Sequence, residues 1–173
     1  YIKTKSGLSA AFFILANMKT YTVADALDKL RNYCAYEARC HKDVKDKLRS
    51  MGMISQAAEQ IIGTLVSENY VNETRFAQQF TSGKFSIKHW GKMRIKRELK
   101  MRGVSEYDIN KAIKTIAADA YLEKLHALSD KRWQQLGGYG TQVKRQKLFQ
   151  YLAYRGWETE LIYQQINRLS SED

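Results

Sequence analysis

Three glycines divide the chain into equivalent stretches, and this repeat restricts the possible folds more than any other feature of the sequence. Gly52, Gly103 and Gly156 lie 51 and then 53 residues apart. Apolar residues stand eight and four positions before each glycine, a spacing that places both on one face of a helix. A period near fifty residues is typical of helical repeat arrays. The apolar pairs are Val44 with Leu48, Ile95 with Leu99, and Leu148 with Leu152.

Each repeat glycine is predicted to end a helix. Glycine adopts the left-handed backbone conformation at little cost, so it permits the turn that closes a helix. We expect the apolar residue after each glycine to fold back over the inner pair, because Met53, Val104 and Trp157 follow directly. An isoleucine stands ten residues beyond each glycine, which extends the repeat into the next helix: Ile62, Ile113 and Ile166.

The composition and the cap signals indicate an all-α protein. Proline is absent, although average usage of about 5% would give several in this length. Helix starts are predicted at Thr22 and Ser105, each followed three residues later by an aspartate, and at Asn72. We therefore predict three tandem blocks of three helices. Their bounds are residues 21–70, 71–117 and 118–169, between an N-terminal extension (1–20) and a tail (170–173).

Positive charge is concentrated in the second block. The net charge is +11, yet residues 21–70 hold seven basic and seven acidic side chains, whereas residues 71–120 hold eleven and five. From Lys84 to Arg102 there are eight Lys and Arg against a single acid, Glu98. Pairing with Arg94 or Arg102 at i, i+4 explains Glu98 better than a role as general base. A localised charge of this kind favours a polyanion or an acidic protein surface as partner.

The basic stretch is predicted to form a helix from His89 onward, with Ile95 and Leu99 inward. Arg97 then points outward, so replacing it together with Arg94 is expected to leave the core packed. An alternative interpretation is a solvated basic face whose tryptophan packs on a neighbouring helix. The predicted partner-binding residues are Lys88, Trp90, Lys92, Arg94, Lys96, Arg97, Lys100 and Arg102.

Residues 1–20 hold two lysines ahead of a short apolar run, residues 8–16. The run is far shorter than the ~20 residues that a membrane span needs, so no membrane association is expected. It has the length of a signal-peptide core, but no convincing small-residue cleavage site follows. We interpret it as an extra amphipathic or disordered segment, or as sequence ahead of a natural start at Met18.

The sequence predicts neither a catalytic site nor a cofactor. It lacks a phosphate-binding glycine motif followed by Lys-Ser/Thr, a marked carboxylate pair and a Ser or Cys nucleophile signature. No metal site is expected either, because Cys34, Cys40 and His41 have no second ligand pair nearby. Two cysteines do not make a disulfide framework, so a reducing compartment, the cytoplasm, is expected.

Four segments carry a resemblance to a known family, in order along the chain. They are residues 33–39 with 46–48 and Gly52, residues 70–77 with Phe80, residues 90–99 ending in Gly103 and Val104, and residues 147–157. No single segment is diagnostic, but the ordered series over ~150 residues is far more specific. Together the segments resemble the RecX family, bacterial regulators of the RecA recombinase, from about residue 21 to residue 169.

The resemblance implies an elongated, curved, all-α protein that lies in the groove of a RecA–DNA filament. We expect the chain to be a monomer. The resemblance also implies that the chain restrains filament growth, ATP hydrolysis, strand exchange and co-protease activity, and so regulates DNA repair and the SOS response. No catalysis by the chain itself is implied. Two other hypotheses remain open: a helical-repeat protein that binds duplex or single-stranded DNA without RecA, and a helical adaptor that binds no nucleic acid.

Overall fold

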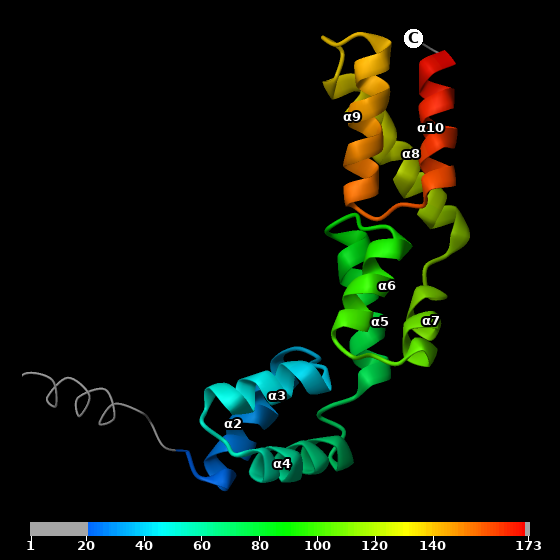
Figure 1. Ribbon diagram of the computed structural model, residues 1–173. Coiled ribbons are helices and arrows are strands. Elements are labelled where there is room, and N and C mark those ends of the chain that lie inside the picture. The colour runs from blue at the N-terminus through cyan, green and yellow to red at the C-terminus, as the bar shows by residue number, and fades with distance from the viewer. Residues whose placement is uncertain (1–20, 172–173) are drawn as a thin grey trace, which may run out of the picture. The chain divides into compact units, whose positions relative to one another are not determined.

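The computed structural model describes residues 21–171, which form nine α-helices and no strand (Figure 1). This confirms the all-α prediction. The predicted extension (1–20) and the end of the predicted tail (172–173) lie outside the described residues. The helices are α2 (Val23–Tyr36), α3 (His41–Ser50), α4 (Ser55–Ser67), α5 (Glu73–Ser86), α6 (Lys92–Met101), α7 (Glu106–Ile113), α8 (Ala118–Gln135), α9 (Thr141–Tyr154) and α10 (Thr159–Ser171).

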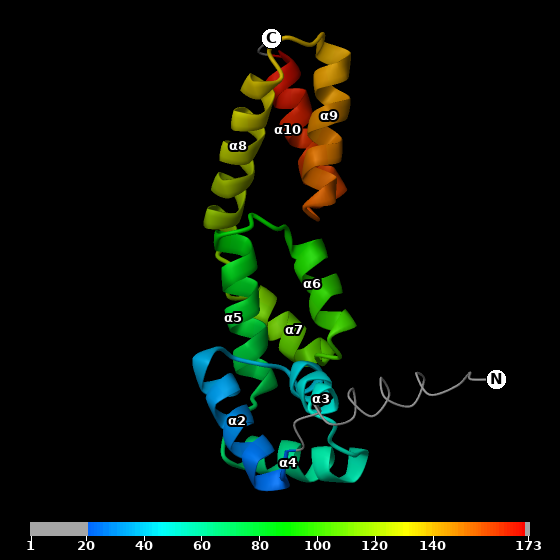
Figure 2. The same cartoon turned by 90° about the vertical axis from the view of Figure 1, so that its left-hand side faces the viewer.

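The described residues divide into two compact units, which we call the first unit (21–71) and the second unit (72–171). The first unit consists of α2, α3 and α4, with α4 packed against both of the others. The second unit holds two further three-helix blocks, the middle block (α5 to α7) and the last block (α8 to α10). Within each of these blocks all three helices pack on one another (Figure 2).

The three repeat glycines follow the ends of α3, α6 and α9 in the left-handed conformation, with φ of 77°, 78° and 79°. In each case the N–H after the glycine donates to the carbonyl of the inner leucine, five residues back. This is the Schellman arrangement, which provides hydrogen-bond partners for carbonyls at a helix end. The predicted glycine turns are therefore confirmed. The three bonds are Met53 to Leu48 (3.1 Å), Val104 to Leu99 (3.2 Å) and Trp157 to Leu152 (3.2 Å).

The inner apolar pairs form the centre of each block. All six side chains are fully buried, with 0% of their surface exposed. Val104 and Trp157, which follow two of the glycines, are also buried, as the fold-back predicts. Of the three isoleucines ten residues further on, Ile113 and Ile166 are buried, while Ile62 is partly buried against the core of the first unit.

The predicted helix starts are confirmed as well. The side chains of Thr22, Asn72 and Ser105 each accept a hydrogen bond from the backbone N–H three residues later, at 3.1, 2.9 and 3.1 Å. At Thr22 the aspartate three residues on also accepts from the cap backbone, which completes a capping box. These local bonds fix where α2, α5 and α7 begin.

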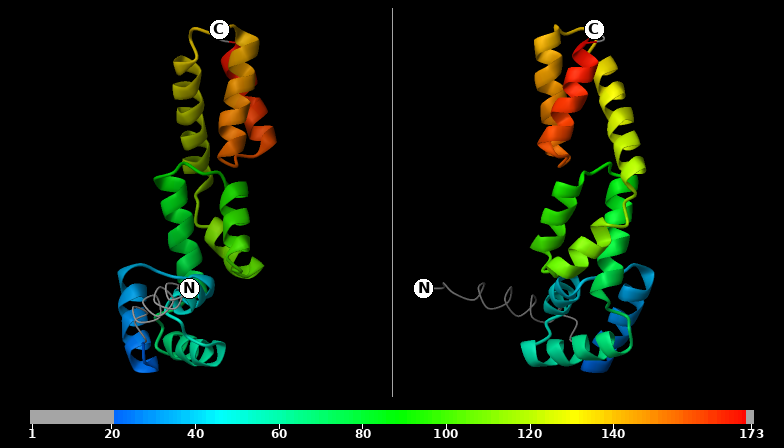
Figure 3. Two further views of the ribbon diagram at one scale, coloured as in Figure 1. Left: turned by 60° about the vertical axis from the view of Figure 1, so that its left-hand side comes forward. Right: turned by 90° about the vertical axis from the view of Figure 1, so that its right-hand side faces the viewer.

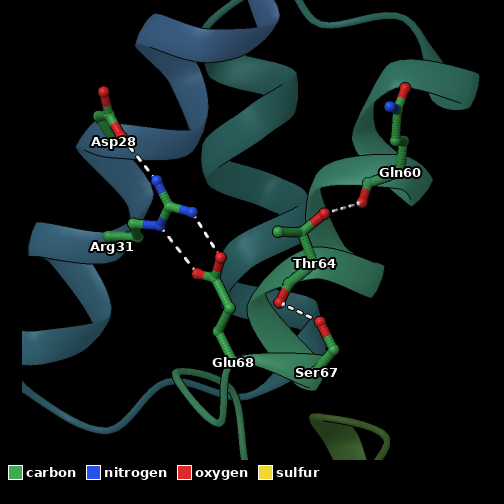
Figure 4. Close-up of polar contacts among 6 residues, drawn as sticks. All are labelled: Asp28, Arg31, Gln60, Thr64, Ser67 and Glu68. Carbon is green, nitrogen blue, oxygen red and sulfur yellow. Dashed lines mark hydrogen bonds and ion pairs between the residues drawn. The ribbon is translucent and has the colours of Figure 1, made fainter.

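An arginine ties two helices of the first unit together. Arg31 on α2 donates to both carboxylate oxygens of Glu68, just after α4, at 2.8 Å from Nε and 2.5 Å from Nη2 (Figure 4). Its Nη1 also donates to Asp28, at 2.8 Å. The hydrogen bonds from Arg31 lower the pKa of the Glu68 carboxyl. A planar guanidinium that binds one carboxylate through two nitrogens fixes geometry as well as charge.

Main-chain hydrogen bonds join the middle and last blocks of the second unit. Figure 3 shows the loop between α5 and α6 next to the turn between α9 and α10. The N–H of Gly91 donates to the carbonyl of Arg155 at 2.9 Å, and the N–H of Met93 donates to that of Gly156 at 3.1 Å. The free N–H groups at the start of α6 thus meet the carbonyls after α9. A Cβ at Gly91 would lie 2.3 Å from the Gly156 carbonyl oxygen, so the approach requires glycine there.

Candidate partner-binding surface

The basic helix begins later than its sequence suggests. α6 starts at Lys92 with Gly91 as its N-cap, so the predicted start at His89 is wrong. His89 has a φ of 55°, which no residue inside a right-handed helix has. The next N–H, that of Trp90, donates back to the carbonyl of Lys84 at 3.1 Å. The chain therefore turns at His89 and carries Gly91 to its contact with the last block.

Trp90 packs within its own block and is half-buried. Its ring meets Phe80 of α5 edge to face, with the centroids 6.4 Å apart. Lys84 places its ammonium 5.3 Å from the centre of the same ring. Trp90 therefore contributes to the packing of the middle block, as in the alternative interpretation of a tryptophan on a neighbouring helix.

Arg94 links the middle block to the last block. Its guanidinium lies 4.1 Å from the ring of Trp90 and 4.7 Å from the ring of Tyr154, after which α9 ends. Its Nη1 donates to the Tyr154 carbonyl at 2.9 Å. Arg94 thus takes part in packing between the blocks, a role that its outward position on the helix did not indicate, because helix periodicity does not show what lies beside a helix.

Lys92 also faces the last block. Its backbone N–H donates to the hydroxyl of Tyr121 at 3.0 Å, and its ammonium lies 4.2 Å from the centre of that ring. The Tyr121 hydroxyl in turn donates to Glu158 at 2.6 Å. Burial raises the pKa of Tyr121, and the bond to Glu158 raises it further. Tyr121 thus stays protonated and holds the start of α6 against the last block.

Two of the predicted residues have acidic partners. Lys100 pairs with Glu106 of α7 at 3.0 Å, and Arg102 pairs with Glu98 at 3.2 Å. The second pair confirms the expectation that Glu98 serves an i, i+4 contact. These pairs reduce the charge that Lys100 and Arg102 present to a partner.

The remaining predicted residues, Lys88, Lys96 and Arg97, are exposed, and none makes an ion pair with another described residue. On α6 the two free cations are flanked by exposed methionines, Met93 at 57% and Met101 at 67%. At about 100° per residue these side chains lie side by side. We define the outer α6 face as Met93, Lys96, Arg97, Lys100 and Met101.

A pocket of about 720 Å³ adjoins the outer α6 face, between the middle and last blocks. Met93, Arg94 and Arg97 line it on the α6 side, and Tyr154 and Glu160 are among the residues opposite. It combines apolar surface with both signs of charge, which suits a protein side chain better than a metal ion. Sequence reasoning missed Tyr154 and Glu160, although the aromatic residues around Gly156 were an available signal.

In the described residues, no three His, Cys, Asp or Glu side chains come together in a way that could hold a metal ion. Cys34 and Cys40 are both buried, and neither is in a disulfide. No helix among residues 21–171 has the length and apolar character required to cross a bilayer.

The middle and last blocks match known domains. The model of the second three-helix domain of RecX matches residues 72–113, and that of the third three-helix domain matches residues 119–166. Together the two matches take in more than half of the chain. The chain belongs to the RecX family.

Relatives named regulatory protein RecX align with most of this chain. The Clostridioides difficile (strain 630) protein is 28% identical over 148 residues, which are 86% of this chain and 69% of the relative. The Leuconostoc mesenteroides protein is 25% identical over 152 residues, 88% of this chain and 57% of the relative. A Listeria innocua protein is 25% identical over 139 residues, which are 80% of this chain and 52% of the relative. The chain therefore spans little more than half the length of the last two RecX proteins.

Solved RecX structures share the fold. RecX from Lactobacillus salivarius superposes with a TM-score of 0.73 at 23% identity, covering 85% of this chain and 96% of that one. A second structure, of a regulatory protein RecX, gives a TM-score of 0.75 at 19% identity and covers 95% of this chain and 80% of that one. The three-helix repeat array predicted from the sequence is therefore confirmed.

Proposed function

We propose that this RecX-family chain is a non-catalytic regulator that binds the RecA–DNA filament, mainly to inhibit RecA. In this role it lowers ATP hydrolysis, strand exchange and co-protease activity, and so acts in DNA repair. It acts as a monomer in the bacterial cytoplasm. Family membership supports a regulatory role, because the relatives are named regulatory proteins. The exposed cations of α6 support an anionic partner.

The proposal assigns the contact to the outer α6 face, and one observation carries it. Lys96 and Arg97 are exposed without an acidic partner among the described residues, while most other cations of that helix are engaged by acids or rings. Free cations beside exposed methionines suit a partner that offers both negative charge and apolar surface. A filament offers both, through DNA phosphates and protein side chains.

The pocket beside this face extends the proposal. A partner side chain that entered it would meet a lining that includes the charged Arg97 and Glu160 and the larger apolar surfaces of Met93 and Tyr154. An apolar side chain next to a polar group fits that lining. Contacts of this kind give specificity, whereas the free cations of α6 increase the rate of encounter.

The test is RecA-dependent ATP hydrolysis on single-stranded DNA, with co-sedimentation of the filament measured in parallel. Lys96→Glu with Arg97→Glu should lose most of the inhibition while circular dichroism and thermal unfolding stay near those of the original chain. The matched control is Lys45→Glu with Lys47→Glu on α3, two exposed cations in the charge-balanced first unit.

The control pair should inhibit almost normally. Equal loss in both double variants would show that net charge, and not the outer α6 face, is responsible. Full inhibition by a folded Lys96/Arg97 variant would overturn the proposed contact. Failure of the original chain to sediment with filaments, or to affect ATP hydrolysis, would overturn the function itself.

A further inference from the structure

A second group of cations lies away from the outer α6 face, where the loop before α6 meets the last block. It draws on three elements: the loop residue His89, three side chains of α8, and the residue that follows α9. Lys124 and Lys131 are seven residues apart on α8 and so share a face of that helix. We name this group the junction cluster: His89, Lys124, Lys131, Arg132 and Arg155.

Three cations of the junction cluster lie over aromatic rings, and none of the three makes an ion pair with another described residue. The guanidinium of Arg155 lies 3.8 Å from the centre of the Tyr151 ring, and that of Arg132 lies 5.2 Å from the same ring. Lys124 places its ammonium 5.2 Å from the ring of Phe85. A ring attracts a cation through its quadrupole but leaves the positive charge in place. These three cations are therefore held in place without being neutralised.

The hydrogen bonds of the two arginines also leave their positive charge uncompensated. Arg132 donates to the side-chain amide of Gln135 at 3.3 Å, and Arg155 donates to the carbonyl of Tyr151 at 3.4 Å, both neutral acceptors. The Nδ1 of His89 and the Nε atoms of both arginines are buried with no partner in the described part of the chain. This region is short of acceptors, and α9 contains no acidic residue to supply one.

The pKa of His89 reflects the positive charge around the ring. Its pKa is lowered first by burial and then by Lys124, Arg155 and Lys131, and no acid opposes them. These interactions place three cations from two elements close to one imidazole. An anion bound among them would favour the protonated ring and raise its pKa.

We propose that the junction cluster binds the phosphodiester backbone of a nucleic-acid strand. Consecutive phosphates provide several negative charges at short spacing, so one strand neutralises several cations together, whereas a single carboxylate neutralises one. Arginine and lysine are also the side chains that most often position a protein on a phosphate backbone. The site differs from the outer α6 face and needs no recombinase, so it extends beyond the proposed function.

Fluorescence anisotropy of a labelled oligothymidylate of about 20 nucleotides tests the site with the full chain and no RecA. Lys124→Gln with Lys131→Gln should lower the slope of log affinity against log salt by roughly 1.4, as expected for two phosphate contacts to a single strand. At about 0.1 M salt this corresponds to an affinity loss on the order of tenfold. The matched control, Lys111→Gln with Lys114→Gln, removes two exposed cations elsewhere in the second unit.

The control should bind almost as the original chain does. Equal losses in the two variants would overturn the site in favour of a diffuse positive field, and an unchanged Lys124/Lys131 variant would overturn it directly. Polyglutamate that competes as well as an oligonucleotide of equal charge would overturn the choice of phosphate. These measurements contain no RecA, so their failure leaves the regulatory proposal to be judged by ATP hydrolysis alone.

A second measurement keeps the site testable if the double variant unfolds. In the original chain, the His89 ring signal is followed by NMR against pH in inorganic phosphate and in chloride of equal ionic strength. Phosphate should raise the apparent pKa of His89 relative to its value in chloride. Identical titrations of His89 in both salts would overturn phosphate binding at the cluster.

Discussion

The two units hold their positive charge in different ways. In the first unit most cations meet carboxylates, as in the pairs of Arg31 with Glu68 and of Lys42 with Asp46. In the second unit many cations lie over aromatic rings, as Arg94 does over Trp90 and Arg155 over Tyr151. An ion pair cancels charge, whereas a ring orders a cation and leaves its field intact. The second unit can thus be well packed and still attract an anion.

Core truncation should have the largest effect and should show whether the units are independent. Leu48 and Leu99 occupy equivalent, fully buried positions, so each change to alanine should destabilise its own unit by about 2–5 kcal/mol. All three tryptophans lie in the second unit, so tryptophan fluorescence during urea unfolding reports that unit alone. Leu99→Ala should lower the fluorescence midpoint, while Leu48→Ala should change only the circular dichroism. Equal fluorescence shifts would show that the units unfold together.

The second-largest effect is expected at the repeat glycines, where replacement by alanine should cost different amounts of stability. Gly52 and Gly156 share a left-handed backbone, which costs a residue with a Cβ about 1–2 kcal/mol. A Cβ at Gly52 would meet nothing within 4 Å, but at Gly156 it would lie 2.3 Å from the Cβ of Arg94. Gly156→Ala should therefore cost roughly 3 kcal/mol, and Gly52→Ala about 1 kcal/mol, by chemical denaturation. Equal costs would argue against a tight junction.

Substitution of two nearby arginines on α6 should distinguish a side chain that packs from one that is free to bind a partner. Arg94→Gln loses contacts with two rings and a bond to the Tyr154 carbonyl, so it should destabilise the second unit by roughly 1–2 kcal/mol. Arg97→Gln should change the free energy of unfolding by less than about 0.5 kcal/mol, as usual for an exposed side chain. Fluorescence-detected urea unfolding measures both. A neutral Arg94→Gln would show that it does not hold the junction.

The smallest predicted difference is in the response to acid. The pKa of His89 lies below 6.5, so the unfolded chain takes up this proton first and the second unit loses stability as pH falls below about 6.5. The pKa of Glu68 lies below 4.5, so its contribution to the first unit persists until the pH falls below about 4.5.

Urea midpoints at about pH 7 and about pH 5 measure this difference, with fluorescence for the second unit and circular dichroism for both. His89→Gln should remove most of the fluorescence shift over this range. A shift that survives the substitution would have to come from another group.

The helices and most of their ends could be predicted because their signals are local; the start of α6 is an exception. The i, i+4 pair before Gly52, Gly103 or Gly156 specifies both the buried face and the Schellman turn. Caps such as Thr22 and Ser105 act within three residues, so a single sequence displays them. The all-helical repeat therefore followed from spacing, cap signals and the absence of proline.

The candidate surface could be predicted only in part. Periodicity places Arg97 on the outside of its helix, and its side chain is exposed. Arg94 lies on the same helix, but Tyr154 contacts it from sixty residues away, and no local pattern reveals such a neighbour. The turn at His89 likewise depends on the distant Arg155 carbonyl that receives the Gly91 N–H. Contacts between blocks thus engage cations that helix periodicity alone leaves exposed.

The joint between Gly91 and Gly156 has a consequence for how such a chain can evolve. Its bonds connect peptide groups, so most side chains around it can change without removing a donor or an acceptor. A duplicated block whose middle helix ended at a glycine would present the same carbonyls to a neighbouring copy. Growth by gene duplication therefore needs two small residues at each new seam, while the faces of the added helices remain free to acquire new partners.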